Sequence, residues 1–143
     1  MKYIILAGTA FQSDSWKEPK HVAKVNGEVL LARTIRQLKE HGVTDIAITS
    51  MSDRLKQFDV PVINYDSSGT WVNAFMPVDE PVCYIFGDVY FSDEAIKTIV
   101  ETKTDSIEFF ASAPPFSPYY PKDWAEPFAF KVVDTIAFRN AID

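Results

Sequence analysis

The chain has 143 residues, of which 47% are apolar and 24% are charged, so its length and composition are those of one globular domain. Its net charge is −6 and its sequence contains no dense cluster of Lys and Arg, which argues against a nucleic-acid polymer as a partner. Its apolar runs are too short to cross a bilayer, and the N-terminus lacks a signal-like stretch. We therefore expect a cytoplasmic protein without a membrane partner.

Apolar runs and amphipathic stretches alternate along the first 107 residues. The pattern predicts, in chain order, a strand at 3–7, a polar loop at 8–20, an Asn26-Gly27 turn, a helix at 28–41, a strand at 45–50, a short helix at 53–58, a strand at 60–64, a short helix at 69–76, a strand at 82–86 and a helix capped by Ser92. Strands that alternate with helices pair in parallel through right-handed crossovers. We therefore predict an α/β fold with three layers, α/β/α, around a mostly parallel, Rossmann-like sheet.

The composition changes after residue 107. Five of the nine prolines and eight aromatic residues lie between Phe109 and Phe130, a proline density that an interior strand or helix does not tolerate. We expect a strand at 107–111, an aromatic excursion over the sheet, a strand at 129–134 and a helix at 136–142. Core positions are expected for Phe109, Phe110, Phe128 and Phe130. The excursion, with Tyr119, Tyr120 and Trp124, is expected to form a wall for a ligand or a contact in a possible homodimer.

Two places at the ends of predicted strands carry residues suited to chemistry. In open α/β sheets the binding crevice lies outside the carboxyl ends of the strands. The turn that begins at Gly8 would let main-chain amides approach a phosphate, and Lys20 would supply a counter-charge. Asp88 follows the strand at 82–86, where one carboxylate suits Mg²⁺. Each feature alone is also compatible with an ordinary turn, but together they favour a phosphate and metal site. The single cysteine, Cys83, is expected to be buried and unreactive.

These residues resemble the signature of the sugar-phosphate nucleotidyltransferases, which have the GT-A-like fold. Residues 5–12, Ile-Leu-Ala-Gly-Thr-Ala-Phe-Gln, are similar to the family's L-A-A-G-x-G-x-R, and Pro19-Lys20 matches its P-K pair. Residues 25–35 and 42–48 resemble the helix entry V-x-G-x-P/V-L-L-x-R-x-I and the segment G-I-x-D-I-x-I that follow. Residues 84–91 resemble the strand that ends in Gly-Asp. The likeness is dense over the first ~50 residues and thin after 107.

The resemblance implies Mg²⁺-dependent transfer of a nucleotidyl group from an NTP to a sugar 1-phosphate or a similar phosphate monoester, with release of pyrophosphate. It assigns catalytic roles to Lys20 and Asp88, and metal binding to Asp88 with Asp134 as a second carboxylate, although a helix N-cap explains Asp134 equally well. It makes 1–107 the nucleotide-binding half and 108–143 a shortened acceptor-side segment of one domain, 1–143. The implied nucleotide-binding residues are Leu6, Ala7, Gly8, Thr9, Ala10, Gln12, Lys20, Asn64, Ser68 and Gly69.

The signature loop departs from the family pattern at two positions. Ala10 replaces its second glycine and Gln12 replaces its arginine, a charge that Lys17 could restore. A nucleotide- or phosphosugar-binding module that has lost turnover therefore remains an alternative. A GT-A glycosyltransferase would lack its Asp-x-Asp motif here. A dinucleotide-binding oxidoreductase fits poorly, because the next helix begins some twenty residues after Gly8. Trp71 could stack on a base or simply pack. Lys131 could contact the acceptor phosphate or lie on the exposed face of a strand.

Overall fold

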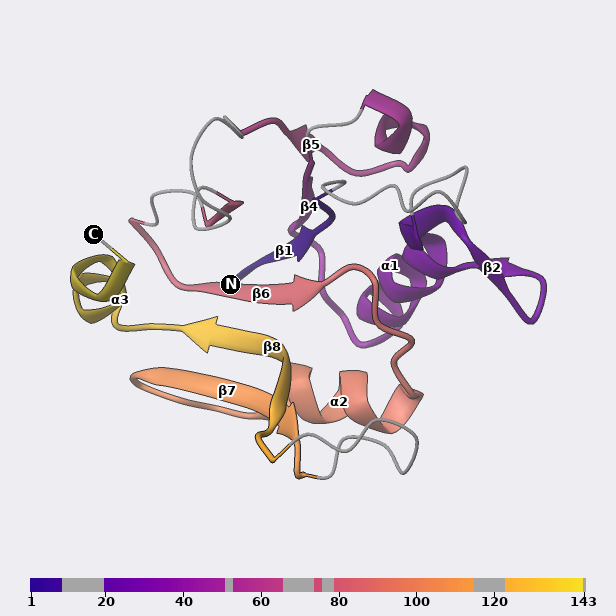
Figure 1. Ribbon diagram of the computed structural model, residues 1–143. Coiled ribbons are helices and arrows are strands. Elements are labelled where there is room, and N and C mark those ends of the chain that lie inside the picture. Colours follow the sequence, from indigo (N-terminus) through magenta and orange to yellow (C-terminus); the bar gives the residue numbers. More distant parts are fainter. Residues whose placement is uncertain (9–19, 51–52, 66–73, 76–78, 115–122, 143) are drawn as a thin grey trace.

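The computed structural model describes residues 1–8, 20–50, 53–65, 74–75, 79–114 and 123–142, and a six-stranded sheet lies at its centre (Figure 1). In spatial order the strands are β5 (Val62–Ile63), β4 (Ile46–Thr49), β1 (Lys2–Leu6), β6 (Val82–Phe86), β8 (Glu126–Val132) and β7 (Ile107–Ser112). The first four run parallel, and β8 runs antiparallel to both of its neighbours. The prediction of a mostly parallel sheet is confirmed.

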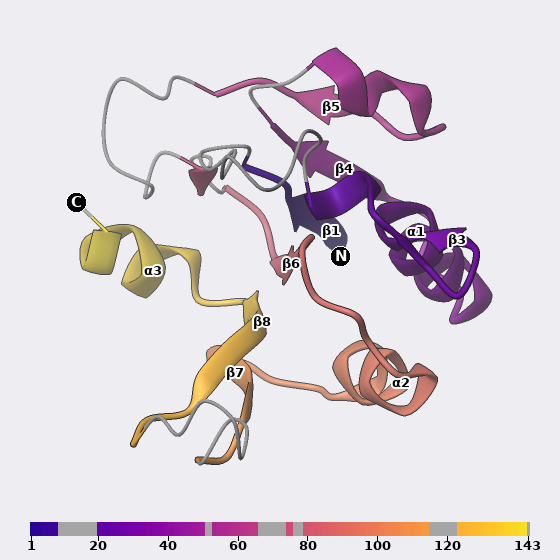
Figure 2. The same cartoon turned by 45° about the vertical axis from the view of Figure 1, so that its right-hand side comes forward.

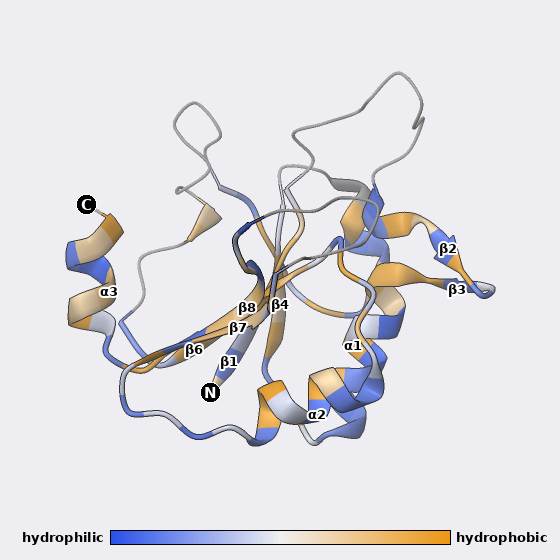
Figure 3. Ribbon diagram, turned by 60° about the horizontal axis from the view of Figure 1, so that its bottom comes forward, coloured by the Kyte–Doolittle hydropathy of each residue, from blue (hydrophilic) through white to orange (hydrophobic). Residues whose placement is uncertain are grey.

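Helices cover both faces of this sheet. In Figure 2, α1 (Leu30–Glu40) and α2 (Asp93–Glu101) lie on one side of the strands and α3 (Thr135–Ile142) lies on the other. Alternation along each strand divides the core accordingly, because successive side chains point to opposite faces. Ile5 packs in the cluster beneath α1 and α2, whereas Ile4 and Leu6 pack with Phe138 of α3. The strands form the apolar, largely orange centre in Figure 3, and the predicted three layers are confirmed.

The two longer helices lie where the sequence predicts them, although α1 begins two residues later than predicted. The apolar stripe of α1 buries Leu31 and Leu38 completely, and Gly42 follows it with a φ of 81°, a conformation that favours glycine. The Oγ of Ser92 accepts a hydrogen bond of 3.1 Å from the amide of Ala95 and so caps α2. None of the described helices is long and apolar enough to cross a membrane.

A small hairpin replaces the predicted first turn of α1. β2 (Lys24–Val25) and β3 (Glu28–Val29) pair antiparallel across Asn26 and Gly27, whose φ values are 53° and 83°. Positive φ at both central residues is the requirement of a tight hairpin turn, so the Asn-Gly pair determines the hairpin. The short helices η1 (Lys20–Val22) and η2 (Asp53–Gln57) complete the described elements. The predicted helix at 69–76 lies largely outside the described residues.

Strands β7 and β8 differ from the prediction in two respects, the start of β8 and the exposure of Phe109. β8 begins at Glu126, three residues earlier than predicted, and includes Pro127 next to a register shift after Phe110 of β7. Such an irregularity accommodates the missing amide hydrogen of proline. Phe109, predicted to lie in the core, is 61% exposed, because β7 is the last strand of the sheet; its ring stacks on that of Phe130.

Lys131 in β8 is buried, and neither sequence interpretation of it is correct. It is only 3% exposed, and its Nζ donates hydrogen bonds of 3.1 and 2.5 Å to the carbonyl oxygens of Val100 and Thr102. These carbonyls lie at the C-terminus of α2, where the helix dipole favours a cation. Lys131 therefore fastens α2 to the sheet. Its neighbour across the ladder, Cys83, is fully buried as predicted, and burial raises the pKa of this thiol to about 12.

Replacing Lys131 with Met should destabilise the fold, because the methylenes stay while two carbonyls lose their donor. The expected loss in the free energy of unfolding is roughly 1–3 kcal/mol, measured by urea denaturation. Lys97→Met, an exposed lysine on α2, is the matched control and should be near neutral. A Lys131→Met protein as stable as the parent would show that the two bonds only compensate for the burial of the ammonium.

Candidate functional site

Four parallel strands end at one edge of the sheet, and the predicted site residues follow them. The chain passes from β1 to β4 and β5 on one side of β1, and then returns to β6 on its other side. The order therefore reverses between β1 and β6, and in open α/β sheets ligands bind at this point, outside the carboxyl ends of the strands. Gly8 lies beyond the end of β1 and Asp88 beyond the end of β6, which places both at the reversal.

The structure brings the two predicted catalytic residues together. Lys20 begins η1, and its Nζ lies 3.5 Å from Oδ2 of Asp88. The two side chains are 58% and 40% exposed, so solvent and ligands can reach both. An exposed ion pair of this kind adds little to stability. An anionic ligand at Lys20 and a cation at Asp88 can therefore replace the ion pair at little energetic cost to the fold.

Gly87 allows the end of β6 to lie directly against the end of β1. Its amide donates a hydrogen bond of 2.9 Å to the carbonyl oxygen of Leu6. A Cβ at Gly87 would lie 2.8 Å from that oxygen, 3.0 Å from Cδ2 of His21 and 3.1 Å from a methyl carbon of Ile5. A side chain at this position would therefore push apart the two strand ends that carry the site, and only glycine fits without a shift.

Gly87→Ala is expected to lower the free energy of unfolding by roughly 1–3 kcal/mol, the usual cost of forcing an extra methyl into a packed site. The measurement is chemical denaturation. Gly42→Ala is the matched control: nothing lies within 4 Å of its added Cβ, so it reports only the cost of the positive φ, about 1–2 kcal/mol. If the Gly87→Ala protein had the same free energy of unfolding as the parent, the close approach of the two strands would not restrict position 87 to glycine.

His21 belongs to the site, although the sequence analysis did not identify it. Its side chain is 6% exposed, packs against Gly87, and leaves Nδ1 buried without a hydrogen-bond partner. Burial lowers the pKa of His21, with Asp88 opposing and Lys20 adding to this shift. His21 is therefore neutral at pH 7. A lone histidine in a polar loop carries no periodic signal that predicts such burial, because its neighbours in sequence do not determine what covers it.

The lowered pKa of His21 predicts a loss of stability on acidification. Because the folded protein holds this imidazole neutral while the unfolded chain protonates it near pH 6.5, unfolding takes up a proton below that pH. The contribution of neutral His21 to the free energy of unfolding is fully present above pH 6.5 and falls as the pH drops toward the pKa of His21 in the folded state. Urea unfolding at pH 7.5 and 5.5 should show a smaller pH-dependent loss for His21→Asn than for the parent. Equal losses in both proteins would show that other groups cause the acid sensitivity.

Hydrogen bonds from α1 hold the segment that follows Asp88. The Nε2 of Gln37, a residue that is 1% exposed, donates to the carbonyl oxygen of Phe91 at 3.2 Å and to Oδ1 of Asp93 at 2.5 Å. The guanidinium of Arg33 lies 4.6 Å from the ring centroid of Tyr90 and also donates to the carbonyl oxygen of Phe91 at 3.4 Å. This segment is therefore fixed at its far end by α1, and at its near end by Gly87.

The remaining predicted nucleotide-binding residues divide into three groups. Leu6 and Ala7 are buried, and the amide of Ala7 bonds to the carbonyl oxygen of Thr49, so their side chains serve the core. Gly8 and Asn64 are exposed at the carboxyl edge, after β1 and β5. The other predicted nucleotide-binding residues lie outside the described residues: Thr9, Ala10, Gln12, Ser68 and Gly69. Four further residues considered in the sequence analysis also lie outside them: Lys17, Trp71, Tyr119 and Tyr120.

Asp134 lies at the opposite edge of the sheet, which corrects its proposed partnership with Asp88. Because β8 is antiparallel, its last residue, Val132, pairs with Val82 at the start of β6, whereas Asp88 follows the end of β6. The Oδ1 of Asp134 accepts a hydrogen bond of 2.9 Å from the amide of Ala137 in α3. The structure therefore supports the interpretation of Asp134 as a helix cap and not as a metal ligand, and we do not include it in the site.

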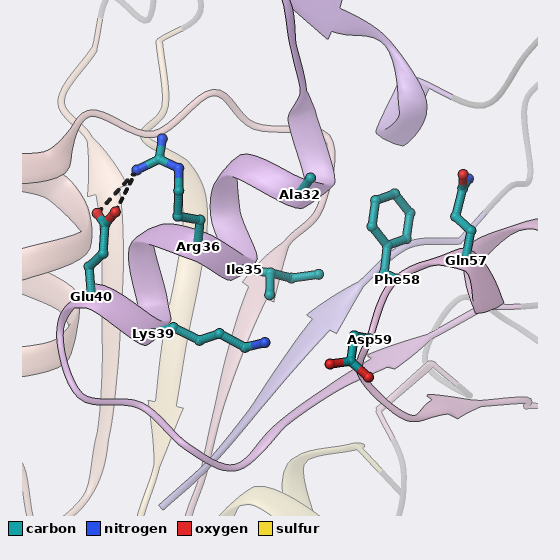
Figure 4. Close-up of a pocket in the computed structure, with 8 residues that line it drawn as sticks. All are labelled: Ala32, Ile35, Arg36, Lys39, Glu40, Gln57, Phe58 and Asp59. Atoms are coloured by element: carbon teal, nitrogen blue, oxygen red, sulfur yellow. Dashed lines mark hydrogen bonds and ion pairs between the residues drawn. The ribbon is translucent and has the colours of Figure 1, made fainter.

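A cavity of about 560 Å³ lies elsewhere, between α1 and the segment that contains η2 (Figure 4). Ala32, Ile35 and Phe58 give it an apolar floor, and Arg36 on its rim is bonded to Glu40. None of the predicted site residues that the structure describes lines it. This cavity is therefore separate from the crevice at the carboxyl edge.

Solved structures of nucleotidyltransferases share this arrangement of strands and helices. A putative glucose-1-phosphate thymidylyltransferase from Bacillus anthracis, solved in complex with a sucrose, matches with a TM-score of 0.65 and 21% identity over 96% of this chain and 73% of its own. The inositol-1-phosphate CTP transferase from T. maritima matches with a TM-score of 0.68 and 16% identity over 94% and 71%. This chain has the nucleotidyltransferase fold. HddC from Yersinia pseudotuberculosis also matches, with a TM-score of 0.59 and 15% identity over 97% and 79%.

The resemblance seen in the sequence is thus confirmed at the level of the fold. No family model matches the sequence, and no curated protein matches it. The likeness therefore rests on three-dimensional structure at low identity.

The nucleotidyltransferase fold raises the question whether these residues suit Mg²⁺. Among the described residues no three His, Cys, Asp or Glu side chains gather into a metal site. Asp88 presents one accessible carboxylate at the crevice. Mg²⁺ is commonly held by one or two carboxylates, with water and substrate phosphates completing its shell. The donor set therefore fits a metal that arrives with a polyphosphate and does not fit a cation enclosed by protein ligands alone.

Proposed function

We propose that this chain transfers a nucleotidyl group from an NTP to a phosphate monoester such as a sugar 1-phosphate and releases pyrophosphate. The ion pair between Lys20 and Asp88 is the observation that carries the proposal. It puts an accessible cation and an accessible carboxylate at the strand-order reversal of a nucleotidyltransferase fold. The named activities of the matched structures, thymidylyl and cytidylyl transfer onto phosphorylated small molecules, support the same class of reaction.

The reaction needs positioning and charge neutralisation more than a protein nucleophile. An oxygen of the acceptor phosphate attacks the α-phosphorus and forms a new P–O bond. The bond from the α-phosphorus to the bridging oxygen breaks, and pyrophosphate leaves with that electron pair. No general base is required, because a phosphate dianion is already nucleophilic. Lys20 neutralises charge on the phosphates, Asp88 would hold Mg²⁺, and the bound ion would neutralise further phosphate charge.

The acceptor side of the site is assigned to the second part of the chain, 108–143. Because β8 runs antiparallel to β6, its beginning lies at the carboxyl edge where Asp88 is found. Ala129 pairs with Ile85, and Glu126 and Asp88 each lie three residues beyond this pair toward the edge. This direction supports an acceptor site formed by the residues that enter β8, beside the nucleotide. The front part, 1–107, supplies Gly8, Lys20 and Asp88.

The test is pyrophosphate release from mixtures of purified protein, Mg²⁺, each NTP and a set of phosphosugars and related phosphate monoesters. Asp88→Asn should lower the turnover of the active mixture by roughly 10²–10³-fold, the usual cost of removing one transition-state charge contact. Lys20→Met should weaken binding of the triphosphate. Asp134→Asn is the matched control, because it changes a strand-end carboxylate at the far edge of the sheet, and asparagine still caps a helix. Its turnover should equal that of the parent.

Three outcomes would change the proposal. Nucleotide binding without pyrophosphate release from any mixture would favour a binding module, the alternative suggested by Ala10 and Gln12 in the signature loop. Failure of every NTP to bind, in a protein that denaturation shows to be folded, would overturn the proposal altogether. Loss of turnover in Asp134→Asn as large as in Asp88→Asn would remove the assignment of the carboxyl edge as the site.

A further inference from the structure

The hydroxyl of Tyr65 lies against the turn that follows β1. A Cβ built on Gly8 would be only 2.9 Å from this oxygen. Tyr65 comes two residues after the last residue of β5, and β5 is separated from β1 by β4. Neighbouring strands lie ~4.8 Å apart, so the side chain of Tyr65 extends across the end of β4 to reach Gly8. The phenol thereby places a hydrogen-bonding group at the start of the signature loop.

This position is on the opposite side of β1 from the charged pair. Lys20 and Asp88 mark the β6 side, and Tyr65 and the exposed Asn64 mark the β5 side. A phosphate chain requires charge neutralisation, and Lys20 supplies it. A phenol hydroxyl and an amide are neutral groups, suited to the neutral hydrogen-bonding atoms of a nucleoside. A nucleotide lying over Gly8 would therefore direct its phosphates toward Lys20 and its nucleoside toward Tyr65.

We propose that Tyr65 is a specificity-determining contact of the site, whose hydroxyl hydrogen-bonds a polar atom of the nucleoside beside the Gly8 turn. This inference rests on the proposed function, because it assumes that the crevice takes a nucleotide. A tyrosine that served only to pack the core would make its contacts through the ring. Here the hydroxyl lies at Gly8, which is exposed, and not within either of the two core clusters.

The contact also explains why residue 8 is glycine for a reason other than backbone conformation. A methyl group at residue 8 would lie 2.9 Å from the hydroxyl oxygen of Tyr65, so the phenol would have to shift to make room for it. Gly8→Ala should therefore lower the melting temperature in the parent and lower it less in a Tyr65→Ala background. This double-mutant comparison checks the packing of the two residues without any ligand. Equal decreases in the two backgrounds would contradict the contact.

The decisive experiment compares two ligands in calorimetric titrations with Mg²⁺: the NTP that binds the parent best, and inorganic tripolyphosphate, which has the charge but no nucleoside. Tyr65→Phe should lower the affinity for the NTP by about five- to tenfold, as expected for one lost hydrogen bond, and should change the affinity for tripolyphosphate less than twofold. Tyr90→Phe is the matched control. It removes the hydroxyl of another partly exposed tyrosine, on the β6 side, and leaves its ring beneath Arg33, so both affinities should stay at the parent's values.

The outcomes separate this inference from the function on which it rests. A parent that binds NTP while Tyr65→Phe binds it equally well would overturn the role of Tyr65 and leave the proposed function standing. Equal weakening of both ligands would overturn the nucleoside assignment and place the hydroxyl on the phosphates. A folded parent that binds neither ligand would overturn the proposed function, and the role of Tyr65 with it.

Discussion

The hydrogen bond from the Gly87 amide to the Leu6 carbonyl is the constraint on which the site depends. It joins the ends of β1 and β6, the two strands between which the order of the sheet reverses. Both the turn at Gly8 and the carboxylate of Asp88 continue from these ends. If the strands separated there, the lysine that enters from η1 would have no partner at 3.5 Å. A single residue without a side chain thus determines whether the charged groups share one crevice.

Rigidity and accessibility are supplied by different residues around this crevice. Gln37 and His21 are buried and hold the segments on either side of Asp88, whereas Lys20 and Asp88 remain exposed. A buried ion pair would resist replacement by ligands, because each charge would be left desolvated without its partner. An exposed pair on a rigid base exchanges its partner easily. The arrangement therefore suits a site that exchanges an internal ion pair for a polyphosphate and a cation.

The sequence predicts the fold well wherever local signals and tertiary structure agree. The strand at 82–86 and the Ser92 cap were predicted as observed, because a short apolar run and a capping serine need no distant information. The proximity of Lys20 and Asp88 was also predictable, since strand ends of a parallel sheet meet at one edge. His21 was not predictable, because it packs against Gly87, which is 66 positions away in the chain. Tyr65 was missed for the same reason.

The incorrect partnership of Asp134 with Asp88 has one cause, the direction of β8. Asp134 would reach Asp88 if β8 were parallel, because its end would then lie at the same edge as the end of β6. Because β8 runs antiparallel to β6, its end lies at the far edge of the sheet and its beginning lies at the carboxyl edge. Hydrophobic periodicity determines which residues face a core but not the direction in which a strand runs. A proline-rich stretch precedes β8 in the sequence, and its composition does not determine the direction of the strand that follows, so that direction could be found only from the three-dimensional structure. That direction brings the residues before Ala129, and not those after Val132, to the edge of the sheet that carries Lys20 and Asp88.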